Sequence, residues 1–133
     1  MTFSNALPEP HGAPERRTRR VFVTDLVLDC LIGVHRHEKD GSQRVRINLD
    51  LDVFESEAPI DDRLSNVLCY EELITKIRRL ANAGHVNLVE TLAERIATVC
   101  LQGTDVRSAR IRVEKLDVFS DAASVGVEIE RFN

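Results

Sequence analysis

Strict alternation of polar and apolar residues over positions 44–54 restricts this chain to folds built on a half-buried β-strand. Successive side chains of a strand point to opposite faces, so this pattern predicts one buried face and one face in water. A sheet that contains such a strand needs a second layer on its apolar side. The buried side is expected to carry the apolar members of the stretch, which are Val45, Ile47, Leu49, Leu51 and Val53.

The rest of the chain supplies three more strand patterns and two helix patterns. The helical segments repeat apolar residues at three- and four-residue steps, and glycines at 84 and 103 follow their predicted ends. The predicted order is strand, strand, helix, helix, strand, strand, at residues 21–34, 44–54, 70–83, 87–102, 108–115 and 124–132. This β-β-α-α-β-β order predicts an α+β fold, in which an antiparallel sheet carries two helices on one face.

The first 19 residues differ in composition from the rest. They hold three of the four prolines and few large apolar side chains, which predicts a disordered tail before a domain at 20–133. Four arginines gather at the boundary, at positions 16, 17, 19 and 20. They could meet an anionic partner, although a solvated flank is the commoner role of so short a basic run.

Length and charge exclude several classes of protein. A chain of 133 residues is long enough for one domain with a real core, and a net charge of -4 argues against general binding of nucleic acid. Neither an apolar run of transmembrane length nor the apolar core of a signal peptide is present, so we expect a soluble, cytoplasmic protein without membrane association. Cys30, Cys69 and Cys100 lack metal-type spacing and are interpreted as reduced, small apolar residues.

Glu90 is a candidate ligand-binding residue at the start of the second helix. Asn87 and Glu90 have the spacing of a capping box, which is the commoner reason for such a pair. The functional alternative is a carboxylate at the mouth of a pocket, where it accepts paired N–H donors from a guanidine-like ligand edge. Spacing alone leaves both interpretations open.

Lys115 and Tyr70 are candidates for proton transfer. Lys115 continues the apolar face of the strand at 108–115, so desolvation could lower its pKa and make it a general base. The alternative is a strand-end lysine that extends to water. Tyr70 is the only tyrosine and opens the first helix, where its phenol could relay a proton or could simply lie at the edge of the core.

The loop between the first two strands carries Glu38 and two histidines. A loop carboxylate is usually only solvated. His35 and His37 could place two imidazoles on one side of an extended segment, with His85 as the third ligand within the domain. That set is weak as a metal site, and we predict neither a metal nor another cofactor.

Residues 86–97, Val-Asn-Leu-Val-Glu-Thr-Leu-Ala-Glu-Arg-Ile-Ala, closely resemble the signature of the dihydroneopterin aldolase family. Three further stretches follow that family's order, at 33–43, 70–73 and 113–115, and the similarity spans about residues 20–132. The resemblance implies the tunnelling fold, whose members close their sheets into a barrel by oligomerisation. In this family the subunits form tetrameric rings that stack into a homo-octamer, with active sites between subunits.

The resemblance also implies roles for individual residues. Glu90, with the adjacent Val89, would bind the amino-pyrimidine edge of a pterin substrate. Lys115 would be the general base or proton shuttle, and Tyr70 would come from a neighbouring subunit to assist protonation of the enol. Glu38 would order the side-chain end of the site. Together they imply retro-aldol cleavage of 7,8-dihydroneopterin in folate biosynthesis, without metal or Schiff base.

Two departures from the family pattern keep alternatives open. The family usually has proline after the lysine, whereas this chain continues with residues 116–119, Leu-Asp-Val-Phe. Before Gly33, residues 29–32 replace an aromatic and histidine-rich approach. Both features look closer to dihydroneopterin triphosphate 2'-epimerase, which shares the fold and the enol chemistry. A pterin-binding ring without turnover is the other alternative, although it would need Glu90 without an acid–base pair.

Overall fold

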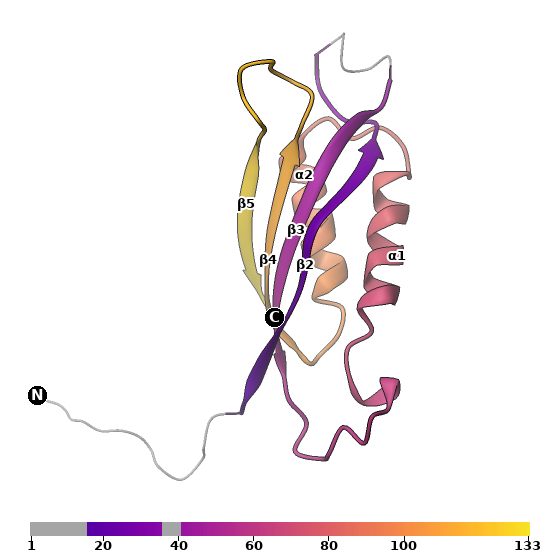
Figure 1. The fold of residues 1–133 in the computed structure, drawn as a ribbon, viewed down its shortest axis with the longest axis vertical. Coiled ribbons are helices and arrows are strands. Elements are labelled where there is room, and N and C mark those ends of the chain that lie inside the picture. Colours follow the sequence, from indigo (N-terminus) through magenta and orange to yellow (C-terminus); the bar gives the residue numbers. More distant parts are fainter. Residues whose placement is uncertain (1–15, 36–40) are drawn as a thin grey trace, which may run out of the picture.

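The computed structural model describes residues 16–35 and 41–133 (Figure 1). In chain order the elements are the strands β2 (Thr18–Cys30) and β3 (Gln43–Phe54), the short 3-10 helix η2 (Leu64–Asn66), the helices α1 (Tyr70–Ala81) and α2 (Val89–Cys100), and the strands β4 (Val106–Lys115) and β5 (Val125–Phe132). This order confirms the predicted α+β arrangement.

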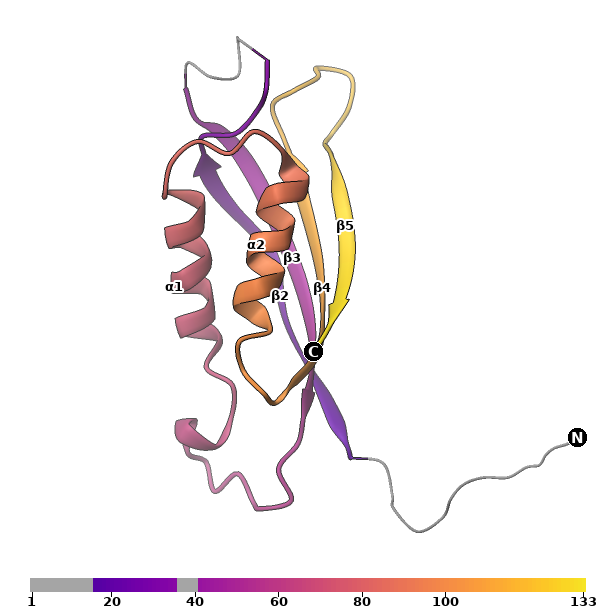
Figure 2. The same cartoon turned by 180° about the vertical axis from the view of Figure 1, so that it is seen from behind.

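The four strands form one antiparallel sheet in the order β2-β3-β4-β5. Both helices cover the same face of the sheet, and the other face carries none (Figures 1 and 2). The sheet is open, with β2 and β5 as its edges. The barrel implied by the resemblance is therefore not formed by one chain, and its closure would need other copies.

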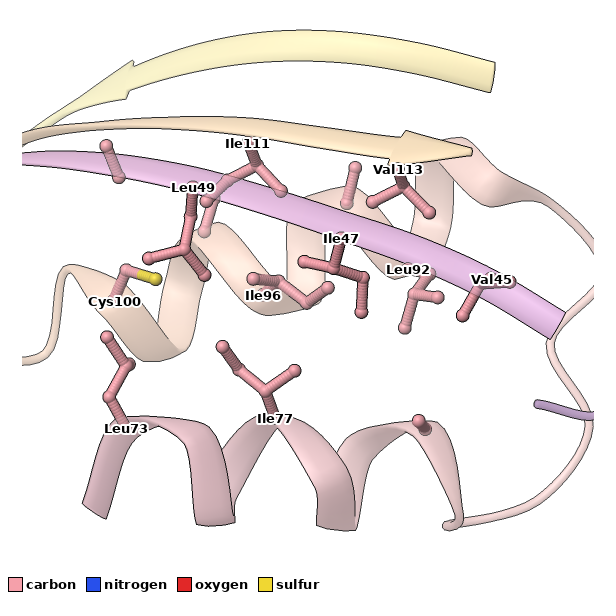
Figure 3. Packing of buried hydrophobic residues seen from close by; sticks show 14 of the residues in the cluster. Val45, Ile47, Leu49, Leu73, Ile77, Leu92, Ile96, Cys100, Ile111 and Val113 are labelled. Carbon is pink, nitrogen blue, oxygen red and sulfur yellow. The ribbon is translucent and has the colours of Figure 1, made fainter. Parts of the chain in front are cut away.

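The core lies between the sheet and the two helices, as the alternation over residues 44–54 predicts. Every second residue of β3 is buried there, and α1 and α2 fill the space opposite with branched aliphatic side chains (Figure 3). Burial of one such side chain stabilises the fold by about 1.5–3 kcal/mol. The buried side chains labelled in Figure 3 are Val45, Ile47, Leu49, Leu73, Ile77, Leu92, Ile96, Cys100, Ile111 and Val113.

The first strand occupies different residues from those predicted. It begins at Thr18, and Glu55 N–H donates to the Arg17 carbonyl oxygen at 2.8 Å, so the boundary expected at residue 19 falls inside paired structure. Arg17 and Arg19 both contact the Glu55 carboxylate at 3.2 Å, which neutralises part of the basic cluster. The predicted tail otherwise lies outside the described residues.

The start of α2 corrects the predicted capping box. Leu88, with extended backbone, is the N-cap, and no side chain caps this helix end. Asn87 stands one residue before the cap and cannot play the predicted role. Helix α1 ends at Ala81, two residues earlier than expected, and the predicted cap glycine, Gly84, lies in the following turn with a φ of 129°. The sequence has the spacing of a capping box at Asn87 and Glu90, but the extended backbone of Leu88 makes that residue the N-cap instead.

The three cysteines are free thiols in the structure. Burial raises the pKa of Cys100 to about 12 and also raises the pKa of Cys30. A thiol becomes reactive as its thiolate, so burial keeps both groups in the inert form. Cys69 is half-buried. In the described residues no helix is long and apolar enough to span a membrane.

The helix-free face of the sheet carries a ladder of ion pairs. Arg46 and Glu114 form a bidentate pair, with Nε to Oε2 at 3.0 Å and Nη2 to Oε1 at 2.9 Å. Ser124 Oγ donates to the same carboxylate at 2.6 Å, and Arg112 lies 3.6 Å from both Glu114 and Glu128. The face that water was expected to cover is therefore charged but largely internally paired.

Candidate functional site

One end of the sheet gathers the loops and most of the predicted site residues. The ends of β2 and β4 and the starts of β3, β5 and α2 all lie at this end (Figures 1 and 2). The described parts of three connections lie there, at residues 31–35 and 41–42, 82–88, and 116–124. We call this the loop end of the molecule.

Glu90 lies in the first turn of α2 with its side chain exposed. It makes no hydrogen bond or ion pair with any residue of the described ranges, so its carboxylate is available to a ligand. The first backbone N–H groups of a helix have no acceptor within the helix, and Leu88 supplies no side-chain acceptor. Val89 and Glu90 therefore present amide donors beside a carboxylate acceptor. This combination suits a planar ligand whose edge carries N–H donors next to a carbonyl oxygen.

The segment that leads into α2 and Glu90 is hydrogen-bonded to the residues that follow β2. Ile32 forms a parallel bridge with Val86, in which Val86 N–H donates to the Leu31 carbonyl oxygen at 2.8 Å and Gly33 N–H donates to the Val86 carbonyl oxygen at 2.9 Å. His85 Nε2 donates to the Gly33 carbonyl oxygen at 2.7 Å. These bonds fix the segment that leads into α2, although it lies in a loop.

Lys115 is the last residue of β4, at the same end of the molecule. It pairs with Val45 of β3 on one side and with Val125 of β5 on the other. The buried residues Ile111 and Val113 precede it on the same face, so its side chain starts on the helix-covered side and is half-buried. The predicted direction of Lys115 is therefore confirmed. The position suits a base that acts at the edge of the core.

Tyr70 does not join this group within one chain. It opens α1, which begins at the end of the molecule opposite the loop end and runs toward it (Figure 2). Its side chain is 62% exposed and makes no hydrogen bond with another described residue. An open groove of about 820 Å³ lies beside the start of α1, and its lining includes neither Glu90 nor Lys115. Only a second copy of the chain could bring a tyrosine to Lys115.

Glu38 and His37 lie outside the described residues, so their predicted roles stay predictions. His85, the third residue of the weak histidine set, uses one ring nitrogen in a hydrogen bond. Its Nε2–H donates to the Gly33 carbonyl oxygen. A ring nitrogen that carries a proton cannot bind a metal. His85 could therefore serve as a ligand only through its other nitrogen.

Known proteins are similar to this chain in sequence and in fold. The family model for dihydroneopterin aldolase matches residues 21–130. The chain belongs to the dihydroneopterin aldolase family. A dihydroneopterin aldolase from Streptomyces coelicolor is 34% identical over 85 residues, which cover 64% of this chain and 71% of that protein.

Two solved structures of the family show how far the fold agrees. The dihydroneopterin aldolase of Burkholderia thailendensis bound to guanine is 33% identical and has a TM-score of 0.75, over 87% of this chain and 92% of that one. The Escherichia coli dihydroneopterin aldolase in complex with neopterin is 26% identical with a TM-score of 0.78, over 85% and 98%.

The structure adds two pairs that sequence reasoning did not assign within this family member. Arg44 binds Asp117, and Arg46 binds Glu114, across 73 and 68 residues of chain. Charged residues on a polar strand face give no signal of their partners, because the register between β3 and β4 decides them. Both pairs flank Lys115, one from the preceding residue and one from the following loop.

Proposed function

We propose that this chain is a dihydroneopterin aldolase in which Glu90 binds the pterin and Lys115 moves the proton. The observation that carries the proposal is the exposed Glu90 carboxylate, without a partner in the described chain, at the same end of the fold as Lys115. A true capping glutamate would have its oxygens committed to the helix. Membership of the family and the amide donors beside Glu90 support the same assignment.

The proposed reaction needs one base and one electron sink. Lys115 takes the proton of the 2'-hydroxyl of 7,8-dihydroneopterin, the C1'–C2' bond breaks, and glycolaldehyde leaves. The electron pair of that bond moves into the ring imine, where protonated N5 accepts it. Protonation of the resulting enol at C1', assisted by Tyr70, and loss of the proton from N5 give 6-hydroxymethyl-7,8-dihydropterin. The substrate supplies its own imine, so these steps are complete without a Schiff base.

The active site of this proposal is shared between copies of the chain. Lys115 and Glu90 come from one subunit and Tyr70 from a neighbour, because one chain holds them at opposite ends (Figure 2). The open edges of β2 and β5 offer unpaired backbone groups through which neighbouring sheets could continue. The tetrameric ring, the octamer and the cytoplasmic location stay predictions from the sequence and its resemblance.

The decisive test is a chromatographic product assay with purified protein. It is given 7,8-dihydroneopterin in one reaction and the triphosphate in another. We expect 6-hydroxymethyl-7,8-dihydropterin and glycolaldehyde from the free diol. No change in either substrate would show that the function is wrong.

The epimerase is the second candidate, and the loop after Lys115 favours it. Asp117 and Arg44 hold that loop where the family usually has a proline. Formation of the 2'-epimer from the triphosphate, with little cleavage of the diol, would move the chain to that branch. A triphosphate substrate would need cationic partners near this loop. Arg44 is a poor one, because its guanidinium is already bound to the Asp117 carboxylate.

A further inference from the structure

The two residues after Lys115, Leu116 and Asp117, are hydrogen-bonded to Arg44 of the neighbouring strand β3. Leu116 N–H donates to the Arg44 carbonyl oxygen at 3.1 Å. In a regular antiparallel pair Arg44 N–H would return a bond to the Leu116 carbonyl oxygen. Here Arg44 N–H donates to Asp117 Oδ2 at 3.0 Å instead. The Asp117 side chain thus replaces the carbonyl acceptor and lets the chain leave the sheet without losing this bond.

The same carboxylate also binds the Arg44 side chain. Nη2 lies 2.7 Å from Oδ1 and Nε lies 3.2 Å from Oδ2, which is the bidentate geometry of a guanidinium on a carboxylate. Hydrogen bonds from the side chain and backbone of Arg44 hold the pKa of Asp117 below its ordinary value. The two side chains are 57% and 40% exposed, so the ion pair adds little to global stability. Its effect is to fix the local geometry.

We infer that Asp117 is a positioning residue for Lys115, acting through Arg44 and the backbone of Leu116. This inference rests on the proposed function, because it takes Lys115 as the proton-transfer residue. Arg44 precedes Val45, which pairs with Lys115, so the Arg44 side chain lies on the helix-free face. The clamp therefore acts from the face of the sheet opposite to the Lys115 side chain.

A clamp is needed because Lys115 is the last residue of β4. Strand ends open most readily, and movement of the end of β4 would displace the Lys115 side chain with it. Catalysis is sensitive to such freedom, since a displacement of about 1 Å can lower a rate by about a hundredfold. Arg44 and Asp117 extend the pairing by one position beyond Lys115. The Lys115 backbone is thereby held from both directions along the strand.

The test compares Asp117→Ala and Asp117→Asn with a matched control, Glu130→Gln. The control breaks the exposed pair of Arg110 and Glu130, at 3.5 Å and with 49% and 43% exposed side chains, within the same sheet. Asp117→Ala is expected to lower kcat for 7,8-dihydroneopterin by about tenfold while KM changes less than about twofold. Asp117→Asn keeps an acceptor for Arg44 N–H and should lose less. Glu130→Gln should match the unmodified protein.

Hydrogen exchange of the Leu116 amide gives a readout that does not depend on activity. Asp117→Ala should speed this exchange, and Glu130→Gln should not. A wild-type kcat in Asp117→Ala, or a large rise in KM at constant kcat, would overturn the positioning role. Loss of the proposed function is distinguishable, because the unmodified protein would then cleave no diol. If Asp117→Ala does not fold, Asp117→Asn carries the same comparison, and an unchanged kcat with faster exchange would refute the inference.

Discussion

Lys115 and Tyr70 lie at opposite ends of the folded domain. Lys115 ends β4 at the loop end, whereas Tyr70 opens α1 at the far end of the helical layer (Figures 1 and 2). A single chain therefore cannot place the phenol beside the ammonium. If both take part in one reaction, the site needs two copies of the chain.

Subunit mixing tests this division of the site. Tyr70→Phe and Lys115→Ala should each be nearly inactive alone, but reassembly of equal amounts should restore about a quarter of the sites, since that fraction combines an intact lysine with an intact tyrosine from a neighbour. Activity is measured after denaturation and joint refolding. Separately refolded and then mixed samples are the control. Absence of any recovery in the joint sample would contradict a shared site.

Replacing Lys115 separates binding from turnover. Lys115→Ala should lower kcat by about a hundredfold or more, the usual contribution of general acid–base catalysis, because the proton of the 2'-hydroxyl then has no base. Pterin affinity should change little, since Glu90 and the α2 amides remain. Calorimetric titration with neopterin and the product assay measure the two effects. Lys76→Ala, an exposed change on α1, is the control, and undiminished turnover in Lys115→Ala would refute the assigned base.

Replacing Glu90 tests whether its carboxylate binds the pterin rather than capping α2. Glu90→Gln should weaken pterin binding by roughly 1.5–3 kcal/mol, about ten- to a hundredfold, because a charge-assisted pair of hydrogen bonds becomes neutral. Thermal stability should hold, and Asn87→Ala should also leave it unchanged, since Leu88 is the N-cap. Loss of a true cap costs about 1 kcal/mol. A fall in Tm for Asn87→Ala with normal pterin binding in Glu90→Gln would restore the capping box.

The lowered pKa of Glu114 predicts how the stability of the fold depends on pH. The Arg46 guanidinium, with help from the Ser124 hydroxyl and against the effect of burial, lowers the pKa of this carboxyl from 4.5 to about 2. A lowered folded pKa means that the pair stabilises the fold above pH 4.5, and that this stability is lost as the pH falls toward 2. The Glu114 side chain is only 6% exposed, so solvent screens the pair little.

Urea unfolding from pH 7 to pH 2 measures the contribution of Glu114. Glu114→Gln should lower the free energy of unfolding by roughly 2–4 kcal/mol at pH 7, because Arg46 loses its bidentate carboxylate partner and keeps only Asp25, at 3.7 Å. The difference from the unmodified protein should shrink below pH 4.5. Glu130→Gln, in an exposed pair, should cost less than about 1 kcal/mol. An equal loss for Glu114→Gln at every pH would contradict the titration argument.

Local periodicity predicted the order of the elements and their buried faces, although the bounds of β2 and the end of α1 differ from the prediction. The alternation over residues 44–54 predicted β3 within one residue, and the four-residue steps from Leu88 predicted the stripe of α2 that reaches Leu92 and Ile96. These predictions held because a strand or helix must bury one side whatever its neighbours are. The resemblance carried by residues 86–97 likewise needed only the order of the residues.

Tertiary structure decided which side chains meet and which do not. The spacing of Asn87 and Glu90 fits a cap, but the path from Val86 through Leu88 removes Asn87 from the helix and leaves Glu90 exposed. Arg44 finds Asp117 only because the sheet register brings together residues 73 positions apart. Such pairings depend on strand order and twist rather than on local sequence. The sequence therefore determined the layers of this protein, and the register of β3 with β4 decided what surrounds Lys115.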